Sequence, residues 1–248
     1  MTEDHPNMEE RLRRVKVTEP PKPLRTVALL AREPGLLVLQ ELISNPLIKL
    51  DTVVTHANLP RSEGGGPRPE LPMYRAMCKG HAVLMEVDFI AAKMPTWYTS
   101  FNYMDLLICL SWRNIVQPEA LRCCRHAINI HRGELPKYAG AEPVRKALDA
   151  REQRVAITAH HMVQKIDAGP EIARVWHDVG DETDPEQVKR NMYPLYAPLA
   201  RMAIQAIATP GTYKERDMVT GRIIGELPPN PPHWDGAICV DEAMKVYP

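Results

Sequence analysis

The sequence has no excess of either charge and no apolar run long enough to cross a membrane. Its 248 residues include 31 Lys or Arg and 31 Asp or Glu, so the formal net charge is zero. A membrane-spanning helix needs about 20 mainly apolar residues, and the charged N-terminus lacks the apolar core of a signal peptide. We therefore expect a cytoplasmic protein without a membrane partner, and no global field that attracts nucleic acid.

Cysteine pairs and metal-binding patterns are also lacking. The five cysteines form no Cys-x-x-Cys pair, and their odd number argues against a disulfide framework. His160 and His161 are adjacent, and adjacent residues of a strand point to opposite faces, which separates them as metal ligands. We therefore predict no metal site, although a short span of sequence holds His126, His131, His160 and His161.

What is present is an alternation of strand and helix signals. A strand at Thr26–Ala31, a helix at Gly35–Ile43 and a strand at Lys49–Thr55 form a βαβ pattern, which predicts a parallel sheet. Further strands are expected over residues 82–87, 105–110, 127–131, 155–159 and 172–179, and helices over residues 71–79, 144–150 and 185–208. The predicted fold class is α/β, an open and mostly parallel sheet with helices on both faces.

Proline is abundant, with 24 residues, and it marks the ends of several of these elements. Asp184 before Pro185 is a favourable cap and start for the last helix. Pro194 and Pro198 lie inside the same pattern, and each removes a backbone donor. We therefore expect the helix to kink or break at these two prolines.

The segment Ala127–Ile172 gathers the side chains that indicate chemistry. Asn129 and His131 are two residues apart on a predicted strand and therefore project from one face. Asp167 follows in a loop whose backbone is restricted by the Gly169-Pro170 pair. An amide donor, an imidazole and a carboxylate at strand ends can bind a developing oxyanion and move a proton.

Three motifs in this segment resemble the folate-dependent formyltransferases, the family of glycinamide ribonucleotide, methionyl-tRNA and sugar N-formyltransferases. They are Asn129-Ile130-His131, the turn Leu135–Gly140 and the loop Asp167–Pro170. The resemblance implies a Rossmann-like formyltransferase fold and the transfer of a formyl group from 10-formyltetrahydrofolate to an amine. It assigns the catalytic roles to Asn129, His131 and Asp167, with the first two at the oxyanion and the carboxylate relaying the proton.

The same resemblance places the folate site beside these residues. In the family, the turn after the strand over residues 105–110 lines the pteridine pocket, and ligands of parallel sheets bind outside the carboxyl ends of the strands. The segment Met162–Asp167 forms the opposite wall. The residues that the resemblance implies for 10-formyltetrahydrofolate are Trp112, Asn114, Ile115, Val116, Met162, Val163, Ile166 and Asp167.

The class of acceptor is inferred from the positions at which the sequence departs from the family. The first turn, Ala31–Gly35, has neither a dinucleotide fingerprint nor the Gly- and Ser-rich loop of glycinamide ribonucleotide formyltransferases. Gly133 replaces a usual serine, and Glu134 is added next to the catalytic histidine. The segment after residue 208 is short and neutral, which argues against gripping tRNA. We therefore expect a small-molecule amine acceptor and no nucleic acid; a homodimer is compatible with the sequence.

Three parts are expected: a flexible tail over residues 1–24, a catalytic domain over 25–208 and a short extension over 209–248 packed on it. The glycine-containing segment Arg61–Pro69 is interpreted as a solvated loop, with an anion clamp by its arginines as the alternative. The aromatic segment 97–103 is interpreted as core, with an acceptor-binding wall as the alternative.

Two other functions stay open. A hydrolase with the same three residues would release formate because water replaces the amine. A non-catalytic relative would bind folate without turnover. Formate release with and without candidate amines separates the first from a transferase, and binding of a folate analogue without turnover on any amine would indicate the second.

Overall fold

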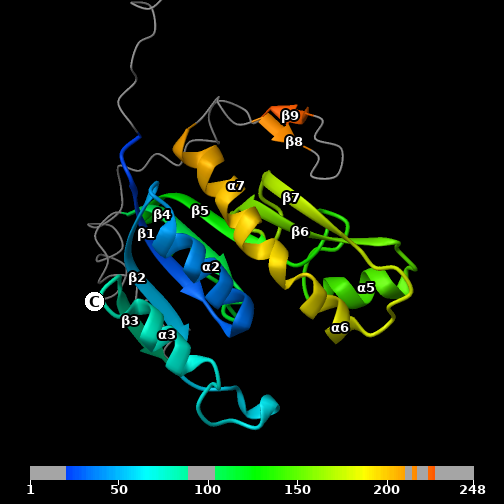
Figure 1. The fold of residues 1–248 in the computed structure, drawn as a ribbon, viewed down its shortest axis with the longest axis horizontal. Helices are drawn as coiled ribbons and strands as arrows, with labels where there is room; N and C mark the ends of the chain where they lie inside the picture. The colour runs from blue at the N-terminus through cyan, green and yellow to red at the C-terminus, as the bar shows by residue number, and fades with distance from the viewer. Residues whose placement is uncertain (1–20, 89–103, 210–213, 217–222, 227–248) are drawn as a thin grey trace, which may run out of the picture.

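The computed structural model of this protein describes residues 21–88, 104–209, 214–216 and 223–226. They form a seven-stranded sheet in the order β3-β2-β1-β4-β5-β6-β7 (Figure 1), and a separate two-stranded sheet of β8 and β9. The strands are β1 (Leu24–Leu30), β2 (Ile48–His56), β3 (Val83–Val87), β4 (Met104–Leu110), β5 (Cys124–His131), β6 (Arg154–His161), β7 (Glu171–Asp178), β8 (Lys214–Arg216) and β9 (Ile223–Glu226). The helices are α2 (Arg32–Ser44), α3 (Leu71–Cys78), α4 (Pro118–Arg122), α5 (Pro143–Asp149), α6 (Pro185–Asn191) and α7 (Tyr196–Ala208), with short 3-10 turns at Arg61–Glu63 and Tyr193–Leu195.

The main sheet is open and mostly parallel, which confirms the predicted fold class. Strands β3, β2, β1, β4 and β5 run parallel to one another, whereas β6 is antiparallel to both of its neighbours, β5 and β7. The chain passes from β1 to β2 on one side and returns to β4 on the other. Ligands of such sheets bind at this reversal, outside the carboxyl ends of the strands.

Alternation along the strands divides the core into two layers. Ala28 and Leu30 of β1 join the larger cluster, which α2, α3 and α7 cover from one side (Figure 1). Val27 and Leu29 point to the other face, where α4 contributes to the second cluster. Burying apolar side chains on both faces stabilises the sheet by roughly 25 cal/mol per Å² of apolar surface.

The prolines act differently at their two positions. Pro194 lies in the 3-10 turn that separates α6 from α7, which confirms the predicted break. Pro198 lies in the first turn of α7 and does not interrupt it, because the first N–H groups of a helix have no intrahelical partner to lose. Asp184 caps α6, as expected, by accepting hydrogen bonds from the backbone N–H groups of Glu186 and Gln187.

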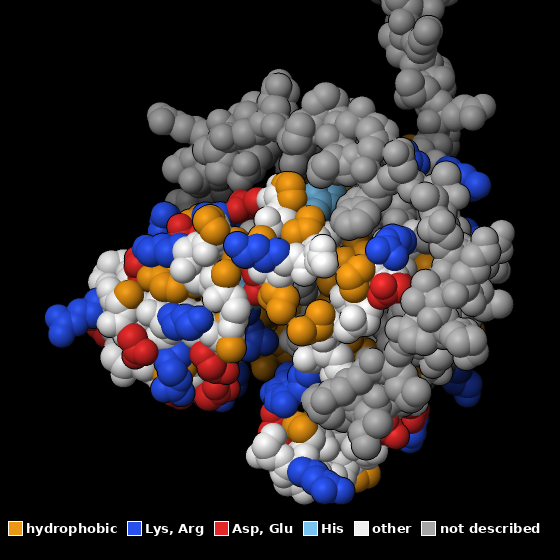
Figure 2. Space-filling model, turned by 180° about the vertical axis from the view of Figure 1, so that it is seen from behind, with side chains coloured by type: hydrophobic (Ala, Val, Ile, Leu, Met, Phe, Trp, Pro, Cys, Tyr) orange, Lys and Arg blue, Asp and Glu red, His pale blue; other side chains and the backbone are white. Residues whose placement is uncertain are grey.

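Some sequence interpretations lie outside the described residues, namely most of the tail 1–24, the aromatic segment 97–103 and most of the extension 209–248. In the described part of the extension, β8 pairs with β9 in antiparallel fashion. None of the described helices is long and apolar enough to cross a membrane. Figure 2 shows basic and acidic side chains interspersed on one face of the molecule.

Candidate active site at the carboxyl edge of the sheet

An open cavity of about 790 Å³ lies at the carboxyl ends of β1, β4 and β5. Every residue that the sequence predicted for catalysis or folate binding lines it. Alternation on β5 explains part of this arrangement, because Asn129 and His131 lie on one face of the strand and line the cavity, whereas Ile128 on the other face is buried in the core. The residues in question are Asn129, His131, Asp167, Trp112, Asn114, Ile115, Val116, Met162, Val163 and Ile166.

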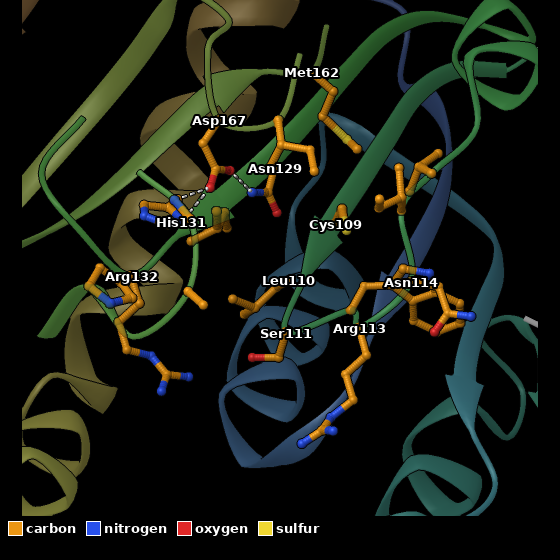
Figure 3. A pocket seen from close by; sticks show the side chains of 18 of the residues that line it. Cys109, Leu110, Ser111, Arg113, Asn114, Asn129, His131, Arg132, Met162 and Asp167 are labelled. Carbon is orange, nitrogen blue, oxygen red and sulfur yellow. Dashed lines mark hydrogen bonds and ion pairs between the residues drawn. The ribbon is translucent and has the colours of Figure 1, made fainter. Parts of the chain in front are cut away.

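Asp167 contacts both of the other predicted catalytic residues. Asp167 Oδ2 lies 3.3 Å from His131 Nδ1, and Asp167 Oδ1 lies 3.4 Å from Asn129 Nδ2 (Figure 3). The side chains of His131 and Asp167 are each only 9% exposed. A carboxylate in this surrounding is nearly enclosed and fixed in direction, which favours a defined proton transfer.

His160 completes the site and was not predicted. It is the residue of β6 that pairs with Asn129 of β5. Its Nε2 lies 3.2 Å from Asn129 Nδ2 and 3.5 Å from Asp167 Oδ1. His161 lies in the next position and its ring faces His126, with 6.3 Å between ring centroids. The adjacent histidines therefore point to different surroundings, and only the first reaches the carboxylate.

Backbone carbonyl groups define which ring nitrogens can be protonated. A carbonyl oxygen only accepts, so His131 Nε2 donates to Tyr138 O at 2.9 Å, and His160 Nδ1 donates to His161 O at 2.9 Å. The remaining nitrogens, His131 Nδ1 and His160 Nε2, both face Asp167. A proton that reaches either imidazole therefore arrives opposite a carboxylate oxygen.

The electrostatic environment keeps Asp167 ionised. Burial raises the pKa of this carboxyl group. The hydrogen bond with His160 and the charge of His131 lower it, and together with the Gly140 N–H they outweigh burial, so the net shift of the pKa is downward. Burial lowers the pKa of His131 below its usual value, against the opposing effect of Asp167. A negative charge beside a readily deprotonated imidazole is suited to accept a proton and pass it on.

The loop that carries Asp167 is held by two close approaches. The N–H of Gly140, in the turn after β5, donates to Asp167 Oδ2 at 2.9 Å. A Cβ atom at Gly169 would lie 1.8 Å from the carbonyl oxygen of His161, so only glycine allows the loop to return against the end of β6. The Pro- and Gly-rich motifs thus position the carboxylate.

The departures Gly133 and Glu134 have different consequences. Glu134 turns away from the histidine, with its carboxylate 3.7 Å from Arg174 and 4.0 Å from Lys137. Gly133 is closely packed, because a Cβ atom there would lie 2.6 Å from Pro143 Cβ and 2.9 Å from His131 Nε2. Glycine at this position therefore leaves room for the hydrogen bond of His131.

The wall beside the carboxylate is apolar and accessible. Ile115 and Ile166 are 62% and 56% exposed, two of the four large apolar side chains with high exposure in the described residues. Val116 and Met162 pack beside them in the second core cluster. Exposed apolar side chains on two sides of one cavity fit a flat heteroaromatic ring.

Cysteine and metal chemistry receive no support from the described residues. Cys109 lines the cavity, but burial raises its pKa to about 12, so its thiol is not a nucleophile at neutral pH. The described cysteines Cys78, Cys109, Cys123 and Cys124 are free. No group of three or more His, Cys, Asp or Glu side chains in this part of the chain could hold a metal ion.

The loop Arg61–Pro69 contributes to the cavity in a way that was not predicted. Arg68 is 2% exposed and pairs with Glu70 at 3.1 Å, so it is not available for the anion clamp considered from the sequence. Glu63 of the same loop lines the cavity and pairs with Arg32 and Arg113. No local pattern relates these three positions, which are distant in sequence.

Comparison with known proteins agrees with this geometry. The family model of formyl transferase matches residues 96–195. The methionyl-tRNA formyltransferase of Thermotoga neapolitana is 32% identical over 124 residues, which cover 50% of this chain and 39% of the relative. The methionyl-tRNA formyltransferase of Rhodopirellula baltica is 27% identical over 153 residues, which cover 60% of this chain and 45% of the relative. The matched region thus spans less than half the length of these relatives.

Solved structures share the fold at low identity. Glycinamide ribonucleotide transformylase 1 from Symbiobacterium toebii superposes with a TM-score of 0.60 at 18% identity, over 75% of this chain and 88% of that one. A formyltetrahydrofolate deformylase from Pseudomonas syringae pv. tomato superposes with a TM-score of 0.60 at 19% identity, over 75% of this chain and 61% of that one. The sugar 3N-formyltransferase WlaRD superposes with a TM-score of 0.57 at 16% sequence identity, over 75% of this chain and 63% of that one.

These relatives correct the predicted partners. A small-molecule acceptor and the absence of nucleic acid were expected, but the named relatives are methionyl-tRNA formyltransferases, whose acceptor is linked to a nucleic acid. A net charge of zero is a sum over the chain and does not exclude an acceptor linked to a nucleic acid. The cavity itself is lined by basic and acidic side chains together, namely Arg32, Arg113, Arg132, Lys189, Glu63, Glu142, Asp167 and Glu186.

The motifs, the matched family model and the relatives thus agree with one another, and the sheet has the architecture of the superposed enzymes. The residues that carry the motifs meet in one cavity at the carboxyl ends of the strands. Residues 96–195 are thus similar to the formyl transferase family, and the sheet has the fold of the superposed formyltransferases.

Proposed function

We propose that this protein transfers the formyl group of 10-formyltetrahydrofolate to the primary amine of an aminoacyl-tRNA. The family supports the donor, and the methionyl-tRNA formyltransferases among the relatives support the acceptor. The observation that carries the reaction type is the contact of Asp167 with His131, His160 and Asn129 on the cavity wall. We place this activity in residues 25–208, with the segments 1–24 and 209–248 outside the catalytic unit.

The apolar wall is the proposed site of the folate ring. Ile115, Val116 and Trp112 on one side and Met162, Val163 and Ile166 on the other would enclose it, with Asn114 at the rim. Burying exposed apolar side chains against a ring contributes roughly 25 cal/mol per Å². This arrangement would orient the formyl group toward Asp167 on the adjoining wall.

The proposed proton path uses Asp167 and His160. The acceptor nitrogen forms a bond to the formyl carbon, the bond from that carbon to N10 breaks, and one proton moves from the amine to N10. Asp167 is ionised and buried, so it would accept the amine proton directly or through His160 Nε2 at 3.5 Å. General acid–base assistance of this kind contributes roughly 100- to 10,000-fold.

Asn129 and His131 are the proposed donors to the oxyanion that develops on the formyl oxygen. Asn129 Nδ2 now contacts Asp167 and His160, and His131 Nε2 contacts Tyr138 O. Either donor would exchange this partner for the oxyanion, since catalytic hydrogen bonds often align only in the reacting complex. Loss of one such donor costs on the order of 100-fold in rate.

The proposal is tested by incubating the full chain with 10-formyltetrahydrofolate and methionyl-tRNA, and measuring the gain of one formyl group on the released methionine. We expect acceptor-dependent formylation. Formate release that is equally fast without acceptor would instead establish the hydrolase. Folate binding without either product would establish a non-catalytic relative.

A further inference from the structure

Two arginines at the mouth of the cavity share a single carboxylate oxygen. Arg32 Nη2 donates to Glu63 Oε1 at 2.7 Å, and Arg113 Nη2 contacts the same oxygen. Arg32 begins α2 directly after β1, and Arg113 follows β4, the neighbour of β1 in the sheet. The two adjacent strands therefore bring both guanidinium groups to one point. In the described part of the chain, neither arginine has another ion pair.

The charges at this point are unbalanced. Two cations face one anion, which leaves one positive charge in excess. Each guanidinium group has five N–H donors, and most of those on Arg32 and Arg113 are not used by Glu63. Burial lowers the pKa of Arg113, and the charge of Arg32 lowers it further. A second negative charge would relieve this repulsion between like charges.

We propose that Arg32 and Arg113 form a subsite for a phosphate group of the acceptor, and that Glu63 is the internal anion which this phosphate displaces. The inference rests on the proposed function, because it concerns the acceptor of the same site. Arginine forks bind phosphate oxygens in pairs and with fixed direction. Figure 3 shows Arg113 and Arg132 extending past Ser111, at the end of the cavity away from Met162.

The position suits an acceptor that enters from the end of the cavity away from Met162, beside the turn that carries Trp112 and Asn114 (Figure 3). Asp167 and the two arginines line the same cavity, so a phosphate held at one end fixes the distance of the amine from the carboxylate. Such positioning is how remote binding energy promotes a reaction. Arg132 also lines the cavity, where its Nε donates to Tyr196 Oη at 2.6 Å.

A purely structural role makes a different prediction. If the arginines only hold the loop that carries Glu63, then Glu63→Gln will loosen the loop and create no anion binding. If Glu63 competes for the subsite, Glu63→Gln will release both arginines and tighten phosphate binding. The sign of the change in affinity therefore separates the two roles.

The experiment is a calorimetric titration of the full chain with two probes, inorganic pyrophosphate and a 5′-phosphorylated RNA trinucleotide CCA. We expect Arg113→Gln to weaken binding about tenfold, and Glu63→Gln to strengthen it several-fold. Arg75→Gln is the matched control, because Arg75 pairs with Glu86 on the exposed surface outside the cavity. Affinity should also fall as salt concentration rises.

Stronger binding of the trinucleotide would identify RNA as the source of the phosphate, and stronger binding of pyrophosphate would identify a diphosphate; both support the subsite. The inference is overturned if Glu63→Gln binds neither probe, or if Arg113→Gln and Arg75→Gln bind equally well. Arg32→Gln provides the same comparison if Arg113→Gln does not fold. Because no formyl transfer is needed, failure of the subsite and failure of the proposed reaction are separate results.

Discussion

Asn129 and His160 face each other across β5 and β6, and the amide Nδ2 lies 3.2 Å from the imidazole Nε2. Since His160 Nδ1 donates to a carbonyl oxygen, a neutral His160 accepts from Asn129 at Nε2. A protonated His160 must instead donate to Asp167 Oδ1, 3.5 Å away. The amide and the carboxylate thus offer His160 one partner for each protonation state.

Replacing His160 should therefore affect proton transfer more than binding. We expect His160→Gln to lower kcat by roughly 100-fold while the affinity for a folate analogue stays within a few-fold. His161→Gln is the matched control, because the ring of His161 faces His126. Steady-state rates and folate titrations of both variants provide the check. Equal losses of kcat in the two variants would contradict a role for His160 in proton transfer.

Asp167→Asn keeps the size of the side chain but removes the carboxylate that is proposed to accept the proton. Turnover should fall by roughly 100-fold or more, with little change in folate affinity. His131→Gln should act in the same direction, and the double variant should be little worse than either single one, since residues that act together are not additive. Nearly normal rates in Asp167→Asn would show that the carboxylate is structural.

Gly133→Ala should disturb His131 through packing alone. The added Cβ atom would lie 2.6 Å from Pro143 Cβ and 2.9 Å from His131 Nε2, so the hydrogen bond to Tyr138 O must lengthen. Overpacking of this kind costs about 1–3 kcal/mol in stability. We expect a lower melting temperature together with a lower kcat. An unchanged protein by both measures would mean that the turn adjusts without strain.

A folate analogue should stabilise the protein through the apolar wall. 5-Formyltetrahydrofolate at about 100 times its Kd should add roughly 2.7 kcal/mol to the free energy of unfolding. Ile166→Asn should reduce this gain, because Ile166 lines the cavity. Met73→Asn is the control, since Met73 is 57% exposed on α3 and outside the cavity. Thermal melts with and without the analogue give the answer; no shift in the wild-type protein would refute folate binding.

The protein should lose stability in mild acid. Burial lowers the pKa of His56 from 6.5 to about 4, with contributions from Arg68 and Arg113. Between these values the unfolded chain binds more protons than the folded one, so the free energy of unfolding falls as the pH drops through this range. His56→Phe retains a ring to stack on Trp112, whose centroid is 4.0 Å away, and should reduce this dependence. Denaturant melts of the wild-type protein and His56→Phe from pH 7 to pH 4 test this prediction. If the free energy of unfolding falls equally with pH in both proteins, the prediction is wrong.

Local patterns in the sequence were sufficient for most elements and for one half of the site. Alternation on β5 places Asn129 and His131 on one face, because strand side chains alternate whatever the rest of the chain does. The cap at Asp184 and the break near Pro194 are likewise local, since they depend only on which backbone groups a neighbouring side chain satisfies or removes.

Only the tertiary structure decided what lies opposite those residues. His160 meets Asn129 through the register of two antiparallel strands, and register depends on packing across the sheet. Glu63 contacts Arg32 and Arg113 because its loop lies near the ends of β1 and β4. No local sequence pattern predicts this contact. The sequence alone thus determined the strands and which residues are proposed to carry the chemistry, whereas the three-dimensional fold determined their partners, since contacts between distant segments arise only when the whole sheet is assembled.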